Sequence, residues 1–210
     1  AQFPFAYHTI GSSMAVRASA YQKQGGMNRR KAGEDFYFLH KFIELGHFSE
    51  LFSTKVIPSP RPSQRVPFGT GKAIGELLAA AESYTTYAPQ SFLDLKVLFT
   101  KVPLLYEGAI PELPESITAF LKTVAFQQKL AEIRAHTSTP DAFVYRFYRW
   151  FNAFLLMKYV HFARDHFYAN VPVTEAAKWL LEALGQVQQP SLSAKALLLR
   201  YRELDKLGYS

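Results

Sequence analysis

The chain has 210 residues, of which 49% are hydrophobic and 20% charged, and this composition excludes a disordered protein. The absence of cysteine excludes disulfides, a thiolate nucleophile and a zinc–cysteine site. The net charge of +7 favours anionic partners but is spread out, with ten Lys and Arg against six Asp and Glu in residues 1–84 and fourteen against eleven in residues 85–210. No stretch approaches the roughly 20 apolar residues of a membrane span. We expect a cytoplasmic location, with peripheral membrane contact left open.

The first 84 residues predict short strands and helices in turn. The expected elements are a strand over 7–17 with a turn at Gly11 to Ser13, a helix over 18–24, a helix over 34–45, a strand over 51–57, and a helix over 70–83. Gly25-Gly26 and Gly46 end the first two helices, because glycine readily adopts the left-handed conformation that follows a helix. Four prolines between residues 58 and 67 predict an extended loop.

Beyond Tyr84 the pattern is helical only. The expected helices cover 90–106 with a break at Pro103, 114–135, 139–168, 174–185 and 191–207. Thr139 followed by Pro140 is typical of a helix start. We therefore expect two domains, residues 1–84 and residues 85–210, and a predominantly helical chain overall.

Gly69-Thr70-Gly71-Lys72 invites a phosphate-loop interpretation, but the pattern is incomplete. A phosphate loop needs glycine where Val66 stands and Ser or Thr where Ala73 stands. Backbone N–H groups at a helix start, with Arg61 and Arg65 upstream, still suit an anion. An ordinary loop-to-helix transition explains the same residues.

Two acidic residues, Glu34 and Asp35, begin the predicted helix over 34–45. Acids are favoured there by the helix dipole alone. The functional alternative is a carboxylate that takes a proton from an attacking hydroxyl.

Metal and nucleic-acid motifs are weaker. His161 and Asp165 share a helical face and His166 is adjacent, but a third ligand is missing, so we expect a solvent-facing hydrogen-bonded pair. The aromatic run from Phe143 to Trp150 lies in a helical context, which favours packing in a core or interface over RNA recognition.

Taken together, the motifs in residues 7–71 resemble the second half of the catalytic domain of family 2, GT-A-type glycosyltransferases. The resemblance rests on the order and spacing of four segments, namely Gly-Ser-Ser-Met-Ala-Val-Arg at 11–17, Gln-Gly-Gly-Met at 24–27, Gly-Glu-Asp at 33–35, and Glu-Leu-Gly at 44–46. It covers about the first third of the chain. It implies a partial GT-A α/β segment followed by an all-α C-terminal region.

The resemblance implies transfer of a sugar from a nucleotide-sugar donor to an acceptor hydroxyl, with inversion. Asp35 would be the catalytic base, supported by Glu34. The acceptor side would be lined by Gly11, Ser12 and Ser13. The donor diphosphate would be bound by Arg61, Gln64, Arg65 and Thr70.

The chain departs from the family in one respect. GT-A enzymes bind the nucleotide through an upstream half that ends in an Asp-x-Asp motif holding a divalent metal, and no Asp-x-Asp occurs in these 210 residues. We therefore expect the chain to be a fragment that is inactive alone and binds no metal itself, with Mg²⁺ or Mn²⁺ held elsewhere in the intact enzyme.

The main alternative is a non-enzymatic helical module that binds a protein partner or an anionic surface through its aromatic and basic residues. It explains the aromatic content of 15% and the charge of +7. It does not explain the order of the four segments. We expect no nucleic-acid partner, and oligomer formation through aromatic helices stays open.

Overall fold

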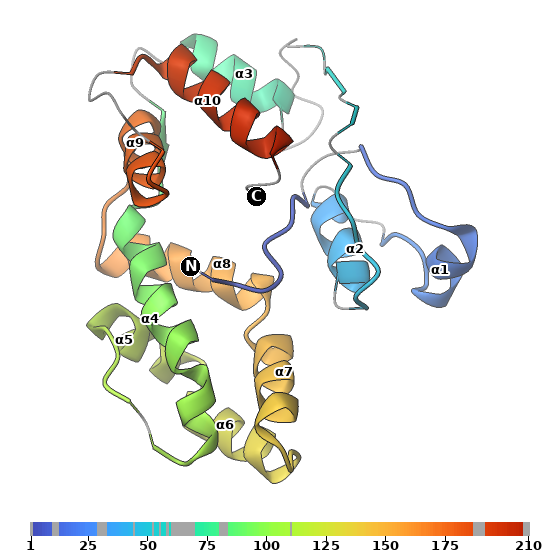
Figure 1. Ribbon diagram of the computed structural model, residues 1–210, viewed down its shortest axis with the longest axis vertical. Coiled ribbons are helices and arrows are strands. Elements are labelled where there is room, and N and C mark those ends of the chain that lie inside the picture. The colour runs from blue at the N-terminus through green and yellow to red at the C-terminus, as the bar shows by residue number, and fades with distance from the viewer. Residues whose placement is uncertain are drawn as a thin grey trace. The chain divides into compact units, whose positions relative to one another are not determined.

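The computed structural model describes residues 2–9, 13–28, 33–43, 45–51, 53–54, 56–57, 59, 70–79, 84–109, 111–186 and 192–207. By contact the chain divides into two units, one made of residues 1–6 and 85–200 and the other of residues 7–84 and 201–210. Described residues form ten helices and one two-stranded sheet (Figure 1). None of the described helices is long and apolar enough to cross a membrane.

The unit that contains residues 7–84 has three short helices. They are α1 (Ala18–Lys23), α2 (Glu34–Ile43) and α3 (Thr70–Ala79). The predicted helix ends are confirmed by the backbone, because Gly25, Gly26 and Gly46 all have positive φ values, between 68° and 77°. The helices therefore lie where the sequence places them.

The two strands expected in this unit are not found. Described residues in 7–17 and in 51–57 have no strand conformation, so the structure does not support a GT-A α/β segment. Residues 7 and 8 instead contact residues just before the second region. Glu50 Oε1 accepts a hydrogen bond from the His8 backbone N–H at 3.1 Å and lies 2.7 Å from His8 Nδ1, and the Tyr7 and Phe48 rings are 4.9 Å apart. A strand is stable only when its backbone pairs with a neighbouring strand.

The other unit is built around α4, which contacts α5, α7, α8 and α9 (Figure 1). Its elements are β1 (Thr85–Thr86), α4 (Pro89–Tyr106), α5 (Glu115–Thr123), α6 (Phe126–Ala135), α7 (Pro140–Trp150), α8 (Ala153–His166), β2 (Val171–Pro172) and α9 (Val173–Ala183). The last helix, α10 (Ala194–Lys206), spans the division between the two units. Strands β1 and β2 pair in antiparallel fashion. This pairing was not predicted, because two short segments so far apart in the chain carry no local signal for it.

The expected break at Pro103 is wrong, because α4 runs through it to Tyr106. Proline removes one backbone hydrogen bond. Leu98, Val102 and Leu105, on either side of Pro103, are fully buried, and the apolar area they remove from water offsets that loss.

Two of the long predicted helices are each divided in two. Ala125 has a left-handed φ of 49° and separates α5 from α6, so the prediction of a single helix over 114–135 is wrong. The helix over 139–168 stops at Phe151, and Asn152 then caps α8 by accepting hydrogen bonds from the N–H groups of Phe154 and Leu155. Thr139 caps α7 as expected, its side chain accepting from the Ala142 N–H.

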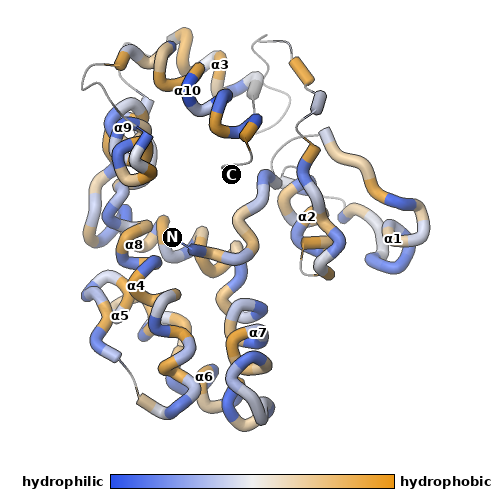
Figure 2. Tube along the Cα trace, in the orientation of Figure 1, coloured by the Kyte–Doolittle hydropathy of each residue, from blue (hydrophilic) through white to orange (hydrophobic). Residues whose placement is uncertain are grey.

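The core of this unit is aromatic. Phe143, Phe147 and Phe151 are fully buried, and the Phe147 and Phe151 rings stack at 6.0 Å. This confirms core packing for Phe143 and Phe147 in the run from Phe143 to Trp150, whereas Tyr145 of the same run is exposed. Hydrophobic and hydrophilic residues both occur along α7 (Figure 2), and the buried Phe143 and Phe147 are four residues apart, as on one face of an amphipathic helix.

A buried carboxylate connects three helices of the same unit. Asp94 of α4 is 3% exposed. Its Oδ2 atom accepts hydrogen bonds from the Ser116 hydroxyl of α5 at 2.5 Å and from the Tyr168 hydroxyl at 2.7 Å, and its Oδ1 atom accepts from Gln90. The Tyr159 hydroxyl of α8 lies 2.8 Å from Ser116. Burial raises the pKa of Tyr159, which keeps this phenol neutral.

We predict that Asp94→Ala lowers the free energy of unfolding by roughly 3 kcal/mol, because it leaves several buried donors without an acceptor. Ser91→Ala, one turn earlier, is the matched control. The Ser91 hydroxyl is buried and has no hydrogen-bond partner among the described residues, so its removal should not destabilise the protein. Urea unfolding of both variants tests this, and equal stabilities would contradict the role given to Asp94.

Candidate functional site

The acidic pair predicted as catalytic begins helix α2. Glu34 and Asp35 occupy its first turn, directly after Gly33, which has a φ of 74°. Both side chains are half-buried, and the Asp35 Oδ1 atom accepts a hydrogen bond from the Phe36 N–H at 2.8 Å. The carboxylates therefore lie at the positively polarised end of the helix, where an ionised acid is stabilised.

Lys41 holds helix α2 against the turn that follows α1. Its Nζ atom donates hydrogen bonds to the backbone oxygens of Gln24 at 3.1 Å and Gly26 at 2.9 Å. These carbonyl groups lie at the C-terminal end of α1, where a cation is electrostatically favoured. The segment Gln24 to Met27 and the segment beginning at Gly33 are thus fixed relative to each other, although they are separate in the sequence.

Tyr21 packs on the same turn. Its ring lies 5.6 Å from the Phe38 ring of α2, and its hydroxyl accepts a hydrogen bond from the Met27 N–H at 3.2 Å. Phe38 and Ile43 are each 3% exposed and anchor α2. Sequence reasoning found the glycines of this turn but missed Tyr21 and Lys41. A tyrosine and a lysine near glycines carry no local signal that could have revealed these contacts.

The remaining predicted residues are only partly described. Ser13 lies exposed in coil before α1, and Thr70 is the first residue of α3. Residues Gly11, Ser12, Arg61, Gln64 and Arg65 lie outside the described residues. Their roles at the acceptor and the diphosphate therefore stay predictions.

The described residues do not fit a divalent metal. No group of three or more His, Asp or Glu side chains within the described ranges is placed to hold one. The hydrogen bond expected between His161 and Asp165 is not found among the described residues. Asp165 instead accepts a hydrogen bond from Arg164 at 2.7 Å, and the His161 ring lies 5.7 Å from the Tyr87 ring. The Arg164 guanidinium lowers the pKa of Asp165 through this hydrogen bond.

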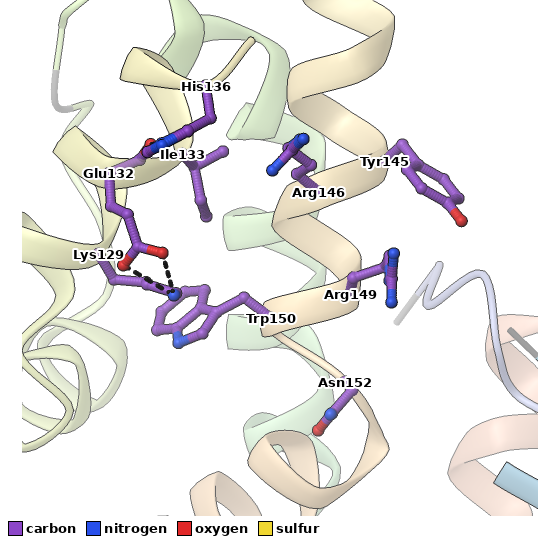
Figure 3. A pocket seen from close by; sticks show the side chains of 9 residues that line it. All are labelled: Lys129, Glu132, Ile133, His136, Tyr145, Arg146, Arg149, Trp150 and Asn152. Carbon is purple, nitrogen blue, oxygen red and sulfur yellow. Dashed lines mark hydrogen bonds and ion pairs between the residues drawn. The ribbon is translucent and has the colours of Figure 1, made fainter. Parts of the chain in front are cut away.

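A second candidate site is an open groove of about 640 Å³ between α6 and α7 (Figure 3). Its lining residues are Lys129, Glu132, Ile133, His136, Tyr145, Arg146, Arg149, Trp150 and Asn152. Three of these residues, Lys129, Arg146 and Arg149, are cationic, and Glu132 carries a carboxylate. The groove could not be predicted from the sequence, because its basic residues are dispersed over two helices that come together only through tertiary packing.

Comparison with known proteins gives no match to a family model, to a curated protein or to a solved structure.

We predict that Gly26→Ala destabilises the α1–α2 segment more than Gly25→Ala does. Both glycines have a φ of 68°, so both alanines carry the left-handed cost of about 1–2 kcal/mol. A Cβ atom at Gly26 would also lie 3.0 Å from the Tyr21 ring, whereas one at Gly25 would meet nothing within 4 Å. Thermal unfolding of the two variants measures the difference. Identical melting temperatures would show that Tyr21 is not packed on this turn.

Proposed function

We propose that residues 7–71 supply the acceptor side and the catalytic base of an inverting glycosyltransferase whose nucleotide-binding half lies outside these 210 residues. The observation that carries the proposal is the order and spacing of the four motif segments, from Gly11 to Gly46. Two features of the structure support it. The acidic pair begins a helix, and the Gly25-Gly26 turn is hydrogen-bonded to that same helix through Lys41.

In the proposed reaction, the Asp35 carboxylate accepts the proton of the acceptor hydroxyl as its oxygen attacks the anomeric carbon of the donor. The bond from this carbon to the diphosphate breaks at the same time, and the nucleoside diphosphate leaves with the bonding electron pair. A single displacement inverts the configuration at the anomeric carbon. Arg61 and Arg65 would stabilise the charge that develops on the diphosphate.

The second candidate function is a helical module that binds a protein partner or an anionic surface. The basic groove between α6 and α7 favours it. The groove and the acidic pair belong to different units of the chain, so one protein could have both properties.

We predict that Asp35→Asn in the full natural protein lowers turnover by roughly 10²–10⁴-fold, the usual contribution of a general base, and leaves donor affinity unchanged. Asp141→Asn is the matched control, since Asp141 also lies in the first turn of a helix and is exposed. Turnover is measured as nucleoside diphosphate released in the presence of acceptor. Near-normal turnover of the Asp35 variant would exclude Asp35 as the base.

We also predict that the 210-residue chain alone does not bind nucleotide-sugars tightly, because it lacks the motif that would hold the donor through a metal. Titration calorimetry with UDP-glucose and GDP-mannose, each with Mg²⁺ or Mn²⁺, measures this. Tight, metal-dependent binding would contradict the assignment of the donor site to residues beyond this chain.

A further inference from the structure

The groove between α6 and α7 has an excess of positive charge, and several of the residues that line it are held in place by packing. Lys129, Arg146 and Arg149 contribute three positive charges and Glu132 one negative charge, which gives a net charge of +2. The negative charge of Glu132 is balanced by Lys129, whose Nζ atom donates hydrogen bonds to both carboxylate oxygens at 2.9 Å. This hydrogen bond lowers the pKa of Glu132, so the carboxylate keeps its charge and its partner.

Arg146 differs from the other cations of the groove. Lys129 is bonded to Glu132, and the Arg149 guanidinium lies 5.8 Å from the centre of the Tyr145 ring. Arg146 makes no hydrogen bond, ion pair or ring contact with the residues that the structure describes. In Figure 3 its guanidinium extends from α7 toward the α6 side of the groove. Its five N–H donors are therefore available to a ligand.

Three of the residues that line the groove, Ile133, Trp150 and Asn152, are held in place by contacts within the protein. The Trp150 ring stacks on Phe126 of the α6 start, with ring centres 5.8 Å apart, and Ile133 is 5% exposed. Asn152 is held by its two capping hydrogen bonds to α8. A ligand would thus bind without having to order these residues, which removes one of the main costs of binding.

We propose that this groove binds the phosphate group of a phosphomonoester, with Arg146 as the principal ligand. A guanidinium can donate two parallel hydrogen bonds to a phosphate, and a phosphomonoester dianion matches the groove's net charge of +2. The volume of about 640 Å³ exceeds that of a phosphate and lies in the usual range for ligand pockets, so it leaves room for the organic part of the ligand. The phosphate belongs either to a free metabolite or to a lipid headgroup.

The test uses the 210-residue chain with Trp179→Phe, which leaves Trp150 as its only tryptophan and makes fluorescence report on the groove. Glycerol 1-phosphate is the soluble probe. Vesicles of phosphatidylcholine with phosphatidic acid, compared with vesicles of phosphatidylcholine alone, are the membrane probe. Saturable binding of glycerol 1-phosphate identifies a free phosphomonoester, and binding only to the phosphatidic acid vesicles identifies a headgroup.

In either case Arg146→Ala should weaken binding by about tenfold or more, the effect of losing a charge-assisted hydrogen-bonded pair. Arg146→Lys should weaken binding less than Arg146→Ala does, because lysine keeps the positive charge but cannot donate two parallel hydrogen bonds to the phosphate. Arg202→Ala is the control for net charge, since Arg202 is exposed on α10, and should bind like the parent. Circular dichroism verifies that each variant is folded. The proposal is overturned if neither probe binds saturably, or if the folded Arg146→Ala variant binds as tightly as the parent.

The test is independent of the glycosyltransferase proposal, because it measures metal-free phosphate binding in the presence of EDTA and no sugar transfer. A failure here would leave the role of Asp35 unaffected.

Discussion

The buried carboxylate of Asp94 is the interaction on which the helical unit most depends. A carboxylate taken out of water is costly unless its oxygens are fully hydrogen-bonded. Here Ser116 and Tyr168 donate to one oxygen and Gln90 to the other, and no cation among the described residues is paired with it. The donors come from α4, α5 and the chain just after α8, so all three segments must be in their native positions at the same time for the carboxylate to be fully hydrogen-bonded. This requirement selects one arrangement of these helices, whereas the aromatic core alone would tolerate several.

The same packing explains which helices the sequence predicted and which it did not. Helices ended by glycine were predicted because a left-handed cap is a local property. The break at Pro103 and the single helix over 114–135 were predicted wrongly, because distant residues decide the conformation at Pro103 and at Ala125. Helix α4 continues through Pro103 and buries Leu105, and the chain turns at Ala125 so that both Leu121 and Phe126 reach the core. Asn152 is different, since an asparagine before an apolar helix is a capping signal that the sequence did contain.

The candidate sites were predictable to unequal degrees. Glu34 and Asp35 follow one another at a helix start, so a linear pattern places them correctly. The groove around Arg146 needs two helices that are separated in the chain by a turn, and its charge pattern depends on which basic residues already have partners. Spacing along one helix carries no such information. Lys41 illustrates the same limit, because its acceptors are backbone carbonyls fifteen and seventeen residues earlier.

The missing strands bear directly on the proposed function. Residues near 7–9 and near 48–50 lie beside each other through the His8–Glu50 and Tyr7–Phe48 contacts, but no backbone ladder joins them in the part of the chain that the structure describes. Two extended segments gain little from pairing alone in water and need a larger sheet to order them. On the proposal that a nucleotide-binding half completes the enzyme, its sheet would supply those backbone partners. The acidic pair does not depend on such a sheet, because α2 is held by Phe38, Ile43 and Lys41 within its own unit. The proposed base would therefore be pre-positioned on a helix that does not depend on the rest of the catalytic domain.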